Sequence, residues 1–347
     1  MKLALQIGYS GAHMALPVAR VQRAEALGYH SVWTAEAYGS DALSPLAYLA
    51  AVTRTIKLGS GIIQLAARTA ANAAMTAATI DAMSGGDRML LGIGVSGPQI
   101  VEGWYGEPWG SPYHRLKDYV AIIRKIWARE APVTHAGREI SLPYRGPGAA
   151  DLAKPLKSIL HMNAKIPIYL GTGTEATVRL TGEIADGWLP LGFVPGSLPE
   201  YLPWLEQGFA RAGGGKSLRD LDIMASCQVQ VNTDVKGALA ALKPETALYV
   251  GGMGARSKNF HKVLMIRRGF ASEAERVQEL YLAGRKDEAA AAVPDEWVDQ
   301  KSLVGPRARI LQRFRAWADS GATLLGVRTQ QDEAVEVMAA AARSAGV

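Results

Sequence analysis

The sequence predicts an α/β protein built as a (β/α)8 barrel, a TIM barrel, with insertions at the carboxyl ends of its strands. Eight short apolar segments alternate with helical segments along the 347 residues, a pattern that indicates parallel strands joined by crossover helices. No polar linker divides the chain into halves of different composition, so we expect one domain over residues 1–347. A doubly wound open sheet is the alternative, because periodicity alone does not close a sheet into a ring.

The first half of the chain is expected to supply four strands and four helices. The strands are predicted at 3–9, 31–33, 56–58 and 89–93, and the helices at 14–28, 44–55, 72–83 and 115–128. Gly28 marks the end of the first helix, Pro45 lies in the first turn of the second, and Gly85-Gly86 follows the third. Residues 103–113, rich in Gly, Pro and Trp, are predicted to be an insertion.

The second half continues the alternation. Strands are predicted at 166–170, 187–189, 224–231 and 323–327, and helices at 175–183, 198–212, 306–319 and 332–344. Two further insertions interrupt it. Residues 130–165 contain several prolines and glycines without strong periodicity, and residues 235–300 are mostly helical with breaks at Gly251-Gly252 and Gly269.

The composition predicts a globular cytoplasmic protein without a membrane partner. Hydrophobic residues make up 48% and charged residues 20%, and no apolar stretch approaches the length of a membrane span. The start, MKLALQIGYSG, has the pattern of a strand rather than of a signal peptide. Cys227 is the single cysteine, which excludes an internal disulfide and fits a reducing compartment.

Charge and histidine spacing argue against nucleic acid and metal. The net charge is +6, but the basic residues are scattered among acids, with no basic run and interleaved aromatics. The six histidines are isolated from one another and from carboxylates at ligand spacing, so we expect no metal site. A modest positive charge suits an anionic small molecule as a partner.

The segment Gly92-Ile-Gly94-Val-Ser-Gly97 matches the dinucleotide pattern GxGxxG. It follows the fourth strand rather than the first, and the residues after it do not form the immediate helix that would face a pyrophosphate. We interpret it as a loop whose backbone approaches a ligand closely.

Small and polar residues follow six successive strands, and in a barrel these strand ends converge on the face where active sites form. They are Gly8, Tyr9 and Ser10; Glu36; Gly61, Ile62 and Gln64; Gly94, Val95, Ser96 and Gly97; Gly171, Thr172, Gly173 and Thr174; and Leu191 and Gly192. The two threonines precede a helix and would offer hydroxyl and N–H groups to a phosphate. One such loop alone would be a turn with an N-cap; six in order favour a ligand-binding face.

In these residues the chain resembles the luciferase-like superfamily, and within it the coenzyme F420-dependent oxidoreductases similar to methylenetetrahydromethanopterin reductase. F420 is a deazaflavin. The resemblance covers nearly the whole chain. It rests on the stretches Ala24–Gly28 with Val32–Tyr38, Lys57–Ile62, Asp87–Gly94, Ala185–Trp188, Tyr249–Gly254 with Asn259-Phe260, and Leu303–Gly305.

The resemblance implies a cofactor site. Gly61–Ile62 matches a non-prolyl cis peptide that backs the deazaflavin ring, with Gln64 nearby. Gly94, Val95, Ser96 and Gly97 match residues along the ring. Gly171, Thr172, Gly173, Thr174, Leu191 and Gly192 match the loops that hold the ribityl-phosphate side. Glu36 matches an acid near the ring, and Glu102 falls near an acid proposed for proton transfer.

The implied activity is hydride transfer between C5 of the deazaflavin and a small organic substrate. Glu36 or Glu102 would be the general acid or base, and each would otherwise be a salt-bridged structural carboxylate. Tyr9, Ser10, Trp104 and Tyr105 would contact the substrate, residues 249–260 would supply a lid, and a homodimer is expected. Ala37 replaces a histidine present in many relatives, which weakens any sugar-phosphate dehydrogenase activity. The alternatives are an FMN-dependent monooxygenase and a non-catalytic ligand-binding barrel.

Overall fold

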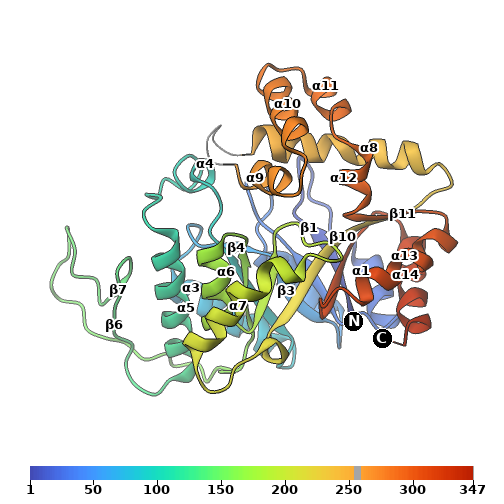
Figure 1. The fold of residues 1–347 in the computed structure, drawn as a ribbon. Helices are drawn as coiled ribbons and strands as arrows, with labels where there is room; N and C mark the ends of the chain where they lie inside the picture. The colour runs from blue at the N-terminus through green and yellow to red at the C-terminus, as the bar shows by residue number, and fades with distance from the viewer. Residues whose placement is uncertain (254–258, 347) are drawn as a thin grey trace.

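The computed structural model describes residues 1–253 and 259–346, and its centre is a closed barrel of parallel strands (Figure 1). The ring runs in the order β1 (Lys2–Gly8), β2 (Ser31–Thr34), β3 (Lys57–Ser60), β5 (Met89–Gly94), β8 (Ile168–Thr172), β9 (Gly187–Pro190), β10 (Asp222–Val231) and β12 (Leu324–Arg328). Pairing of β12 with β1, and of β10 with β9 and β12, closes it. The predicted barrel is confirmed, and the open-sheet alternative is wrong.

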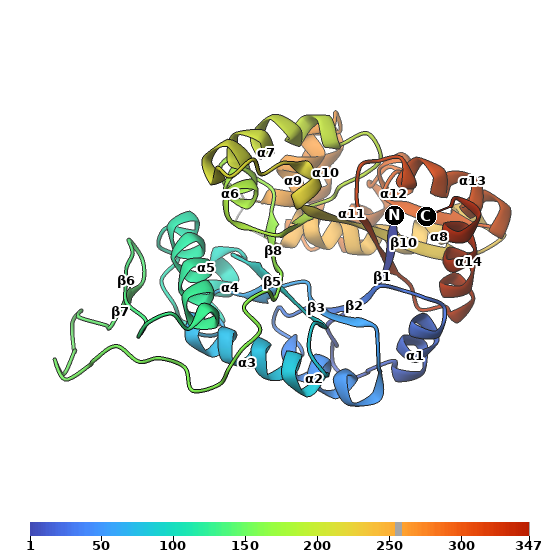
Figure 2. The same ribbon diagram turned by 90° about the horizontal axis from the view of Figure 1, so that it is seen from below.

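Helices surround this ring, as the view from below shows (Figure 2). They are α1 (Val18–Ala26), α2 (Leu43–Val52), α3 (Ala70–Met83), α5 (Pro112–Ala128), α6 (Glu175–Ile184), α7 (Leu198–Ala212), α13 (Arg307–Ala318) and α14 (Asp332–Ser344). Each overlaps a predicted helix. The first begins at Val18 instead of residue 14, because the preceding segment is a loop in which the Ser10 hydroxyl accepts the Ala15 amide.

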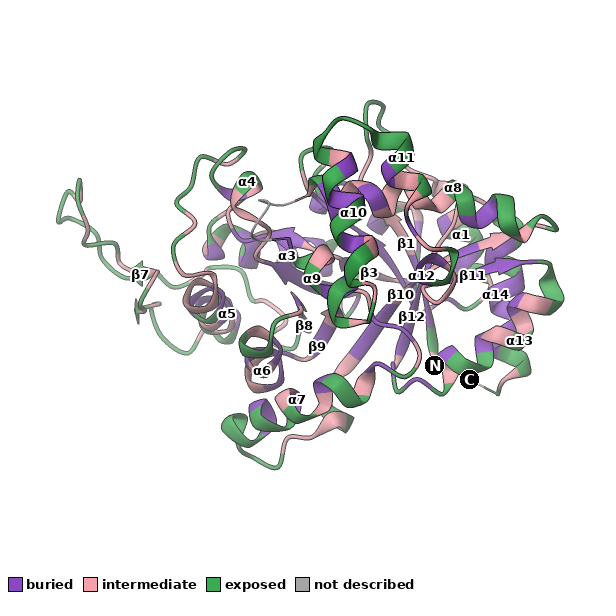
Figure 3. Cartoon of the chain, turned by 45° about the horizontal axis from the view of Figure 1, so that its top comes forward, coloured by how far each residue is buried: buried purple, intermediate pink, exposed green. Residues whose placement is uncertain are grey.

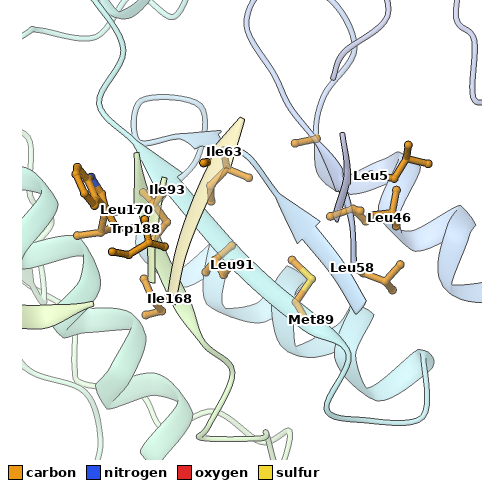
Figure 4. Close-up of a cluster of buried hydrophobic side chains, with 14 of the residues drawn as sticks. Leu5, Leu46, Leu58, Ile63, Met89, Leu91, Ile93, Ile168, Leu170 and Trp188 are labelled. Atoms are coloured by element: carbon orange, nitrogen blue, oxygen red, sulfur yellow. The ribbon is translucent and has the colours of Figure 1, made fainter. Parts of the chain in front are cut away.

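Side chains alternate between the two faces of the strands. Outward-facing residues pack against the helices and include Leu5, Leu58, Met89, Leu91, Ile93, Ile168 and Leu170 (Figure 4). The inward-facing set fills the barrel and consists of Ala4, Trp33, Leu90, Tyr169, Met224 and Leu324. This alternation is the period of a strand that is buried on both faces.

Trp33 and Tyr169 are the two bulkiest residues of the interior. Their rings meet edge to face with centroids 5.1 Å apart, a favourable aromatic geometry. Glycine makes the room for each: a Cβ at Gly59 would lie 2.3 Å from the Trp33 ring, and a Cβ at Gly187 would lie 2.1 Å from the Tyr169 ring. The barrel is therefore a packed core at this level, and open space is left above it.

Residues 235–253 and 259–300 form a helical unit, called the helical unit 235–300 below, over the carboxyl ends of the strands (Figures 1 and 3). It comprises α8 (Val235–Ala247), a π-helical turn (Leu248–Gly252), α9 (Phe260–Arg267), α10 (Ala271–Leu282), α11 (Lys286–Ala291) and α12 (Asp295–Asp299). Its buried side chains form a hydrophobic cluster of their own. The predicted breaks are present, since the π-helical turn ends at Gly252 and Gly269 has a φ of +87°.

Several short elements were not predicted. β11 (Ser302–Gly305) pairs with the end of β10, and β4 (Ile63–Gln64) pairs with β5. β6 (His135–Ala136) and β7 (Ser141–Leu142) form a hairpin in 130–165, the segment that extends away from the barrel (Figure 1). Three of these strands have only two residues, too few to show a period in the sequence, and β11 lies directly after the insertion that was predicted to be helical.

One short helix corrects an expectation. α4 (Pro98–Val101) begins directly after Gly97, which is its N-cap residue, so the GxGxxG segment is followed by a helical turn after all. The turn is only four residues long. Within the residues that the structure describes, no helix is long and apolar enough to cross a membrane.

Candidate functional site

A cavity of about 860 Å³ lies between the carboxyl ends of the barrel strands and the helical unit 235–300. Its size falls within the range of small-molecule and cofactor pockets. The barrel contributes Gln6, Gly8, Tyr9, Trp33, Thr34, Gly61, Leu191, Gly192, Ser226, Gln228 and Arg328 among others. The helical unit and the residues after it contribute Leu242, Glu245, Thr246, Tyr249, Val250, His261, Leu264, Trp297 and Lys301.

Four of the predicted site residues line this cavity: Tyr9, Gly61, Leu191 and Gly192. The peptide bond between Gly61 and Ile62 is cis, which confirms the feature that the resemblance implied. Gly192 has a φ of +64°, and a Cβ there would lie 2.5 Å from the Leu264 side chain of α9. Glycine at this position therefore allows the helical unit to sit directly on the loop after β9.

The side chain of Ile62 occupies the space over the ends of β5 and β8. A Cβ on Gly94 would lie 2.8 Å from Ile62, and a Cβ on Gly171 would lie 2.9 Å from it. The resemblance matched Gly94 to the deazaflavin ring and Gly171 to the ribityl-phosphate side. In the structure both glycines make room for Ile62, because a side chain at either position would collide with it.

Glu36 is enclosed and fully engaged by hydrogen bonds. Its side chain is 3% exposed. Arg68 binds both carboxylate oxygens, Nη1 to Oε1 at 2.8 Å and Nη2 to Oε2 at 3.0 Å. The backbone amides of Ala42 and Gln64 also donate to them. A carboxylate held by four donors outside the cavity wall has the structural role that the sequence left open, which argues against general acid or base catalysis by Glu36.

Gln64 completes the connection between the end of β2 and the loop after β3. Its side-chain amide donates to the carbonyl oxygens of Glu36 and Ala37, at 3.1 and 3.3 Å. The residue is 2% exposed and therefore supports the Gly61–Ile62 segment from behind. The Glu36–Arg68 pair and Gln64 thus fix the position of the cis peptide relative to β2.

The threonine hydroxyls after β8 are occupied within the protein. Thr172 shares a hydrogen bond of 2.7 Å with Thr181, and Thr174 is the N-cap residue of α6 in a capping box with Thr177. Both hydroxyls are therefore engaged within the protein, and their contact with a phosphate stays a prediction. Gly173 remains next to the cavity wall, since a Cβ there would lie 3.3 Å from the Leu191 Cβ.

The remaining predicted residues lie away from the cavity lining. Glu102 is exposed at the end of α4, where it accepts the Trp109 amide at 3.3 Å. Trp104 is 62% exposed. The Ser10 hydroxyl donates to Ala15, and the Tyr105 hydroxyl to Ala37.

The predicted residues between β5 and α4 hold that loop in place. Val95 packs against the main hydrophobic core, Ser96 has a φ of +54°, and Gly97 caps α4. None of these residues, nor Glu102, Trp104 or Tyr105, is among the residues that line the cavity, so their contacts with a cofactor or substrate stay predictions.

The polar groups that face the cavity come from both the barrel and the helical unit. The Arg328 guanidinium binds Glu245, with Nη2 and Oε1 2.6 Å apart, and Gln228 donates to Oε2 at 3.2 Å. Burial opposes ionisation of Glu245, but Arg328 and Gln228 more than offset it, so the pKa of Glu245 is lowered. Glu245 is therefore a held anion.

Lys301 and His261 also line the cavity, and they were not predicted from the sequence. Burial is the main cause that lowers the pKa of Lys301 to about 8 and the pKa of His261 to about 4. His261 is consequently neutral near pH 7, and its ring lies 4.7 Å from that of Tyr249. His261 lies in α9 and Lys301 in the turn between α12 and β11, and neither belongs to a motif that would identify it in the sequence.

The lid expected over residues 249–260 falls partly outside the described residues, which stop at Met253 and resume at Asn259. The described ends contribute directly to the cavity or its support. Tyr249 and Val250 line it, and the Asn259 side chain donates to both of their carbonyl oxygens at 2.9 and 2.8 Å.

Comparison with known proteins finds one matching family model and several relatives of similar length. The family model described as luciferase-like monooxygenase matches residues 5–324. A protein of Mycobacterium tuberculosis named "Putative coenzyme F420-dependent oxidoreductase" is 45% identical, with 98% of each chain covered. The 5,10-methylenetetrahydromethanopterin reductase of Archaeoglobus fulgidus is 29% identical over 87% of this chain and 86% of the reductase.

Solved structures share the fold at lower identity. The coenzyme F420-dependent tetrahydromethanopterin reductase of Methanopyrus kandleri superposes with a TM-score of 0.78 at 22% identity, covering 97% of both chains. The oxygenating constituent of 3,6-diketocamphane monooxygenase from Pseudomonas putida, in complex with FMN, superposes with a TM-score of 0.66 at 17% identity, covering 98% of this chain and 97% of that chain.

Proposed function

The chain belongs to the luciferase-like monooxygenase family, and from that membership we propose that it is a coenzyme F420-dependent oxidoreductase. The observation that carries the proposal is the cavity at the carboxyl ends of the strands, with the cis peptide Gly61–Ile62 in its wall. The 45% identical relative, whose name assigns F420 provisionally, supports the choice of cofactor.

The residues of the cavity fit a deazaflavin. Gly8, Gly61 and Gly192 contribute backbone alone to its wall, so a flat ring system can approach the strand ends closely. Lys301 and Arg328 place two cationic side chains on the lining against the single carboxylate of Glu245 among the lining residues. This excess of positive charge suits a cofactor that carries a phosphate.

The ring would be held at Gly61, with Ile62 and the Glu36–Arg68 pair fixing that segment from behind. The ribityl-phosphate side would lie toward Leu191 and Gly192, next to the loop that leads into α6. Leu242, Leu264 and Trp297 of the helical unit line the same cavity. Their apolar side chains would exclude water from the reacting atoms.

Bound there, the deazaflavin supplies a two-electron hydride carrier through its C5 atom. The protein's own part is to orient a small organic substrate against that atom. Tyr9 and Tyr249 bring phenol hydroxyls to the cavity from opposite sides, the barrel and the helical unit. We propose that they contact the substrate.

A stopped-flow or steady-state kinetic assay under nitrogen tests the proposed function. Oxidation of reduced F420 would be followed by its visible absorbance on addition of small carbonyl, imine and alkene compounds. Thr246→Trp, which fills the cavity, should abolish F420 binding and oxidation. Thr79→Trp on the exposed face of α3 is the matched control and should retain both. Unchanged F420 binding by Thr246→Trp would place the cofactor site elsewhere.

An FMN-dependent monooxygenase on the same barrel is the second candidate. The family model and the shared fold with the FMN-bound monooxygenase of Pseudomonas putida support it. It differs in an observable way, because such an enzyme consumes oxygen when supplied with reduced FMN. Oxygen uptake with reduced FMN, and none of the F420 activity above, would favour this candidate.

A further inference from the structure

Lys301 brings an ammonium group to the cavity without a partner of opposite charge. The residue follows α12 and precedes β11, and its side chain lines the cavity. Its Nζ lies 4.6 Å from the centre of the Trp297 ring. Within residues 1–253 and 259–346, no hydrogen-bond acceptor or carboxylate lies within bonding distance of Nζ, so its protons are available to a ligand.

The charged and titratable neighbours of Lys301 come from every element packed around it. Glu245 of α8 attracts the ammonium but is held by Arg328 and Gln228. Arg328 of β12 and Arg268, which follows α9, repel it. His261 of α9 is neutral near pH 7. Lys301 is therefore the cavity-lining group that exchanges a proton closest to neutral pH, as efficient general acids do.

The other acids considered for this reaction are less suited. Glu36 is enclosed by Arg68 and two backbone amides, and Glu102 is exposed away from the cavity. Burial raises the pKa of Tyr249 above its ordinary value, which makes its phenol a weaker acid. The geometry therefore favours Lys301, whose side chain lines the cavity, over these groups as the proton donor.

We propose that Lys301 is the catalytic acid–base residue of this cavity, and that the substrate is a compound with a C=O or C=N bond whose oxygen or nitrogen accepts a hydrogen bond from Nζ. The inference rests on the proposed F420-dependent function and deepens it. It goes beyond the family resemblance, which implied only Glu36 and Glu102 for proton transfer.

With a carbonyl substrate, the carbonyl carbon would gain a hydride, and with it two electrons, from C5 of the reduced deazaflavin, which would be oxidised. A C–H bond forms, the C=O π bond breaks, and its electron pair takes a proton from the Lys301 ammonium to give an alcohol. Solvent reprotonates the neutral amine and accepts the remaining proton of the oxidised cofactor. In the reverse direction the neutral amine accepts the alcohol proton.

Lys301→Met tests the role, with Lys286→Met as the matched control. The Lys286 ammonium also lies over an aromatic ring, that of Tyr281 at 5.7 Å, but on the exposed surface of the helical unit. The probes are cyclohexanone, benzaldehyde and 1-pyrroline with reduced F420. Lys301→Met should still bind F420, more weakly than the unchanged protein because one cationic side chain of the lining is lost. At saturating F420 it should lose roughly 10²–10⁴-fold in kcat. Lys286→Met should change neither.

A second pair of measurements separates catalysis from structure. The pH profile of kcat should show a limb near the pKa of Lys301, about 8, and Lys301→Arg should remove that limb because arginine does not titrate there. Trace acetic anhydride labelling of the free protein, read by mass spectrometry, should give a lower pKa for Lys301 than for Lys117, whose pKa Glu183 raises.

Each outcome decides between the claims. Failure of the unchanged protein to bind F420 overturns the proposed function and this inference together. Binding of F420 with no oxidation by any of the three probes leaves the cofactor proposal standing and contradicts the substrate class. Turnover by Lys301→Met at the rate of Lys286→Met, or a pH profile identical in Lys301→Arg, contradicts the acid–base role alone.

Discussion

At the scale of single residues, Glu36 and Arg68 show how a polar pair can matter without facing a ligand. The pair is buried, bidentate and tied to the loop that carries the cis peptide. Removing one member of a buried ion pair leaves an uncompensated charge, which costs more than the pair itself contributes. We therefore expect loss of the pair to lower the free energy of unfolding, rather than to act on the catalysed reaction directly.

Glu36→Gln should therefore lower the free energy of unfolding by about 3–5 kcal/mol, measured by chemical denaturation at pH 7. Glu336→Gln is the control, because its partner Arg23 and Glu336 are both about half exposed and such a pair contributes at most about 1 kcal/mol. Equal stability of the two variants would contradict the structural role. Loss of turnover with full stability would restore Glu36 to the mechanism.

Lys301→Met should have the opposite effect on stability. Burial disfavours the ammonium in the folded protein, so removing it should raise the free energy of unfolding by about 1–3 kcal/mol at pH 7. The pKa is lowered on folding, so the cost of the charge is present in full below pH 8. It disappears as the pH rises toward the ordinary lysine value of about 10.4. Denaturation at pH 7 and pH 10.5 checks this; a gain that does not shrink at high pH would contradict it.

At the scale of elements, the loops after β3, β5 and β8 form one packed unit around Ile62. Their sequences predicted a set of glycines on one face of the barrel, and the chain folds that way. The glycines make room for the side chain that turns inward after the cis peptide, which is Ile62. The spacing of residues in the sequence does not predict which side chain this is. The position of the residues near α4 relative to the cavity could not be predicted either, because it depends on the path of the loop after β5.

Gly94→Ala should lower the free energy of unfolding by about 1–3 kcal/mol, since its Cβ would meet Ile62 at 2.8 Å. The cost should shrink in an Ile62→Ala background, where the space is free, and a double-mutant cycle measures the difference. Gly97→Ala is the control, because its Cβ would meet only the flexible end of Gln99 at 3.4 Å. Additive effects of Gly94→Ala and Ile62→Ala would show that the two residues do not share this space.

At the scale of the whole molecule, the barrel forms one wall of the cavity and the helical unit 235–300 covers the cavity from the other side. The barrel follows from local periodicity, which is why eight strands and their helices could be predicted. For the helical unit, only its helical content could be predicted. Its position over the barrel depends on long-range contacts such as that of Leu264 with Gly192. Glu245, His261 and Lys301, whose pKa values are shifted, lie where these two parts meet, and their surroundings are not known until both parts are placed.

We also propose that the chain forms a homodimer, as the family resemblance implies. Analytical ultracentrifugation of the purified protein should give a mass near twice the 37.0 kDa of the chain. The measurement should be made across a range of concentrations, since a weak dimer dissociates on dilution. A single species at the mass of one chain throughout would contradict the proposal.

The central claim is that the cavity binds a deazaflavin, and equilibrium titration with F420 and, separately, with FMN tests it most directly. Tryptophan fluorescence reports binding, because Trp33 and Trp297 line the cavity. We predict micromolar binding of F420, weak binding of FMN and loss of the F420 signal in Thr246→Trp. Tight binding of FMN with no response to F420 would contradict the claim and move the protein to the flavin-dependent monooxygenases of its family.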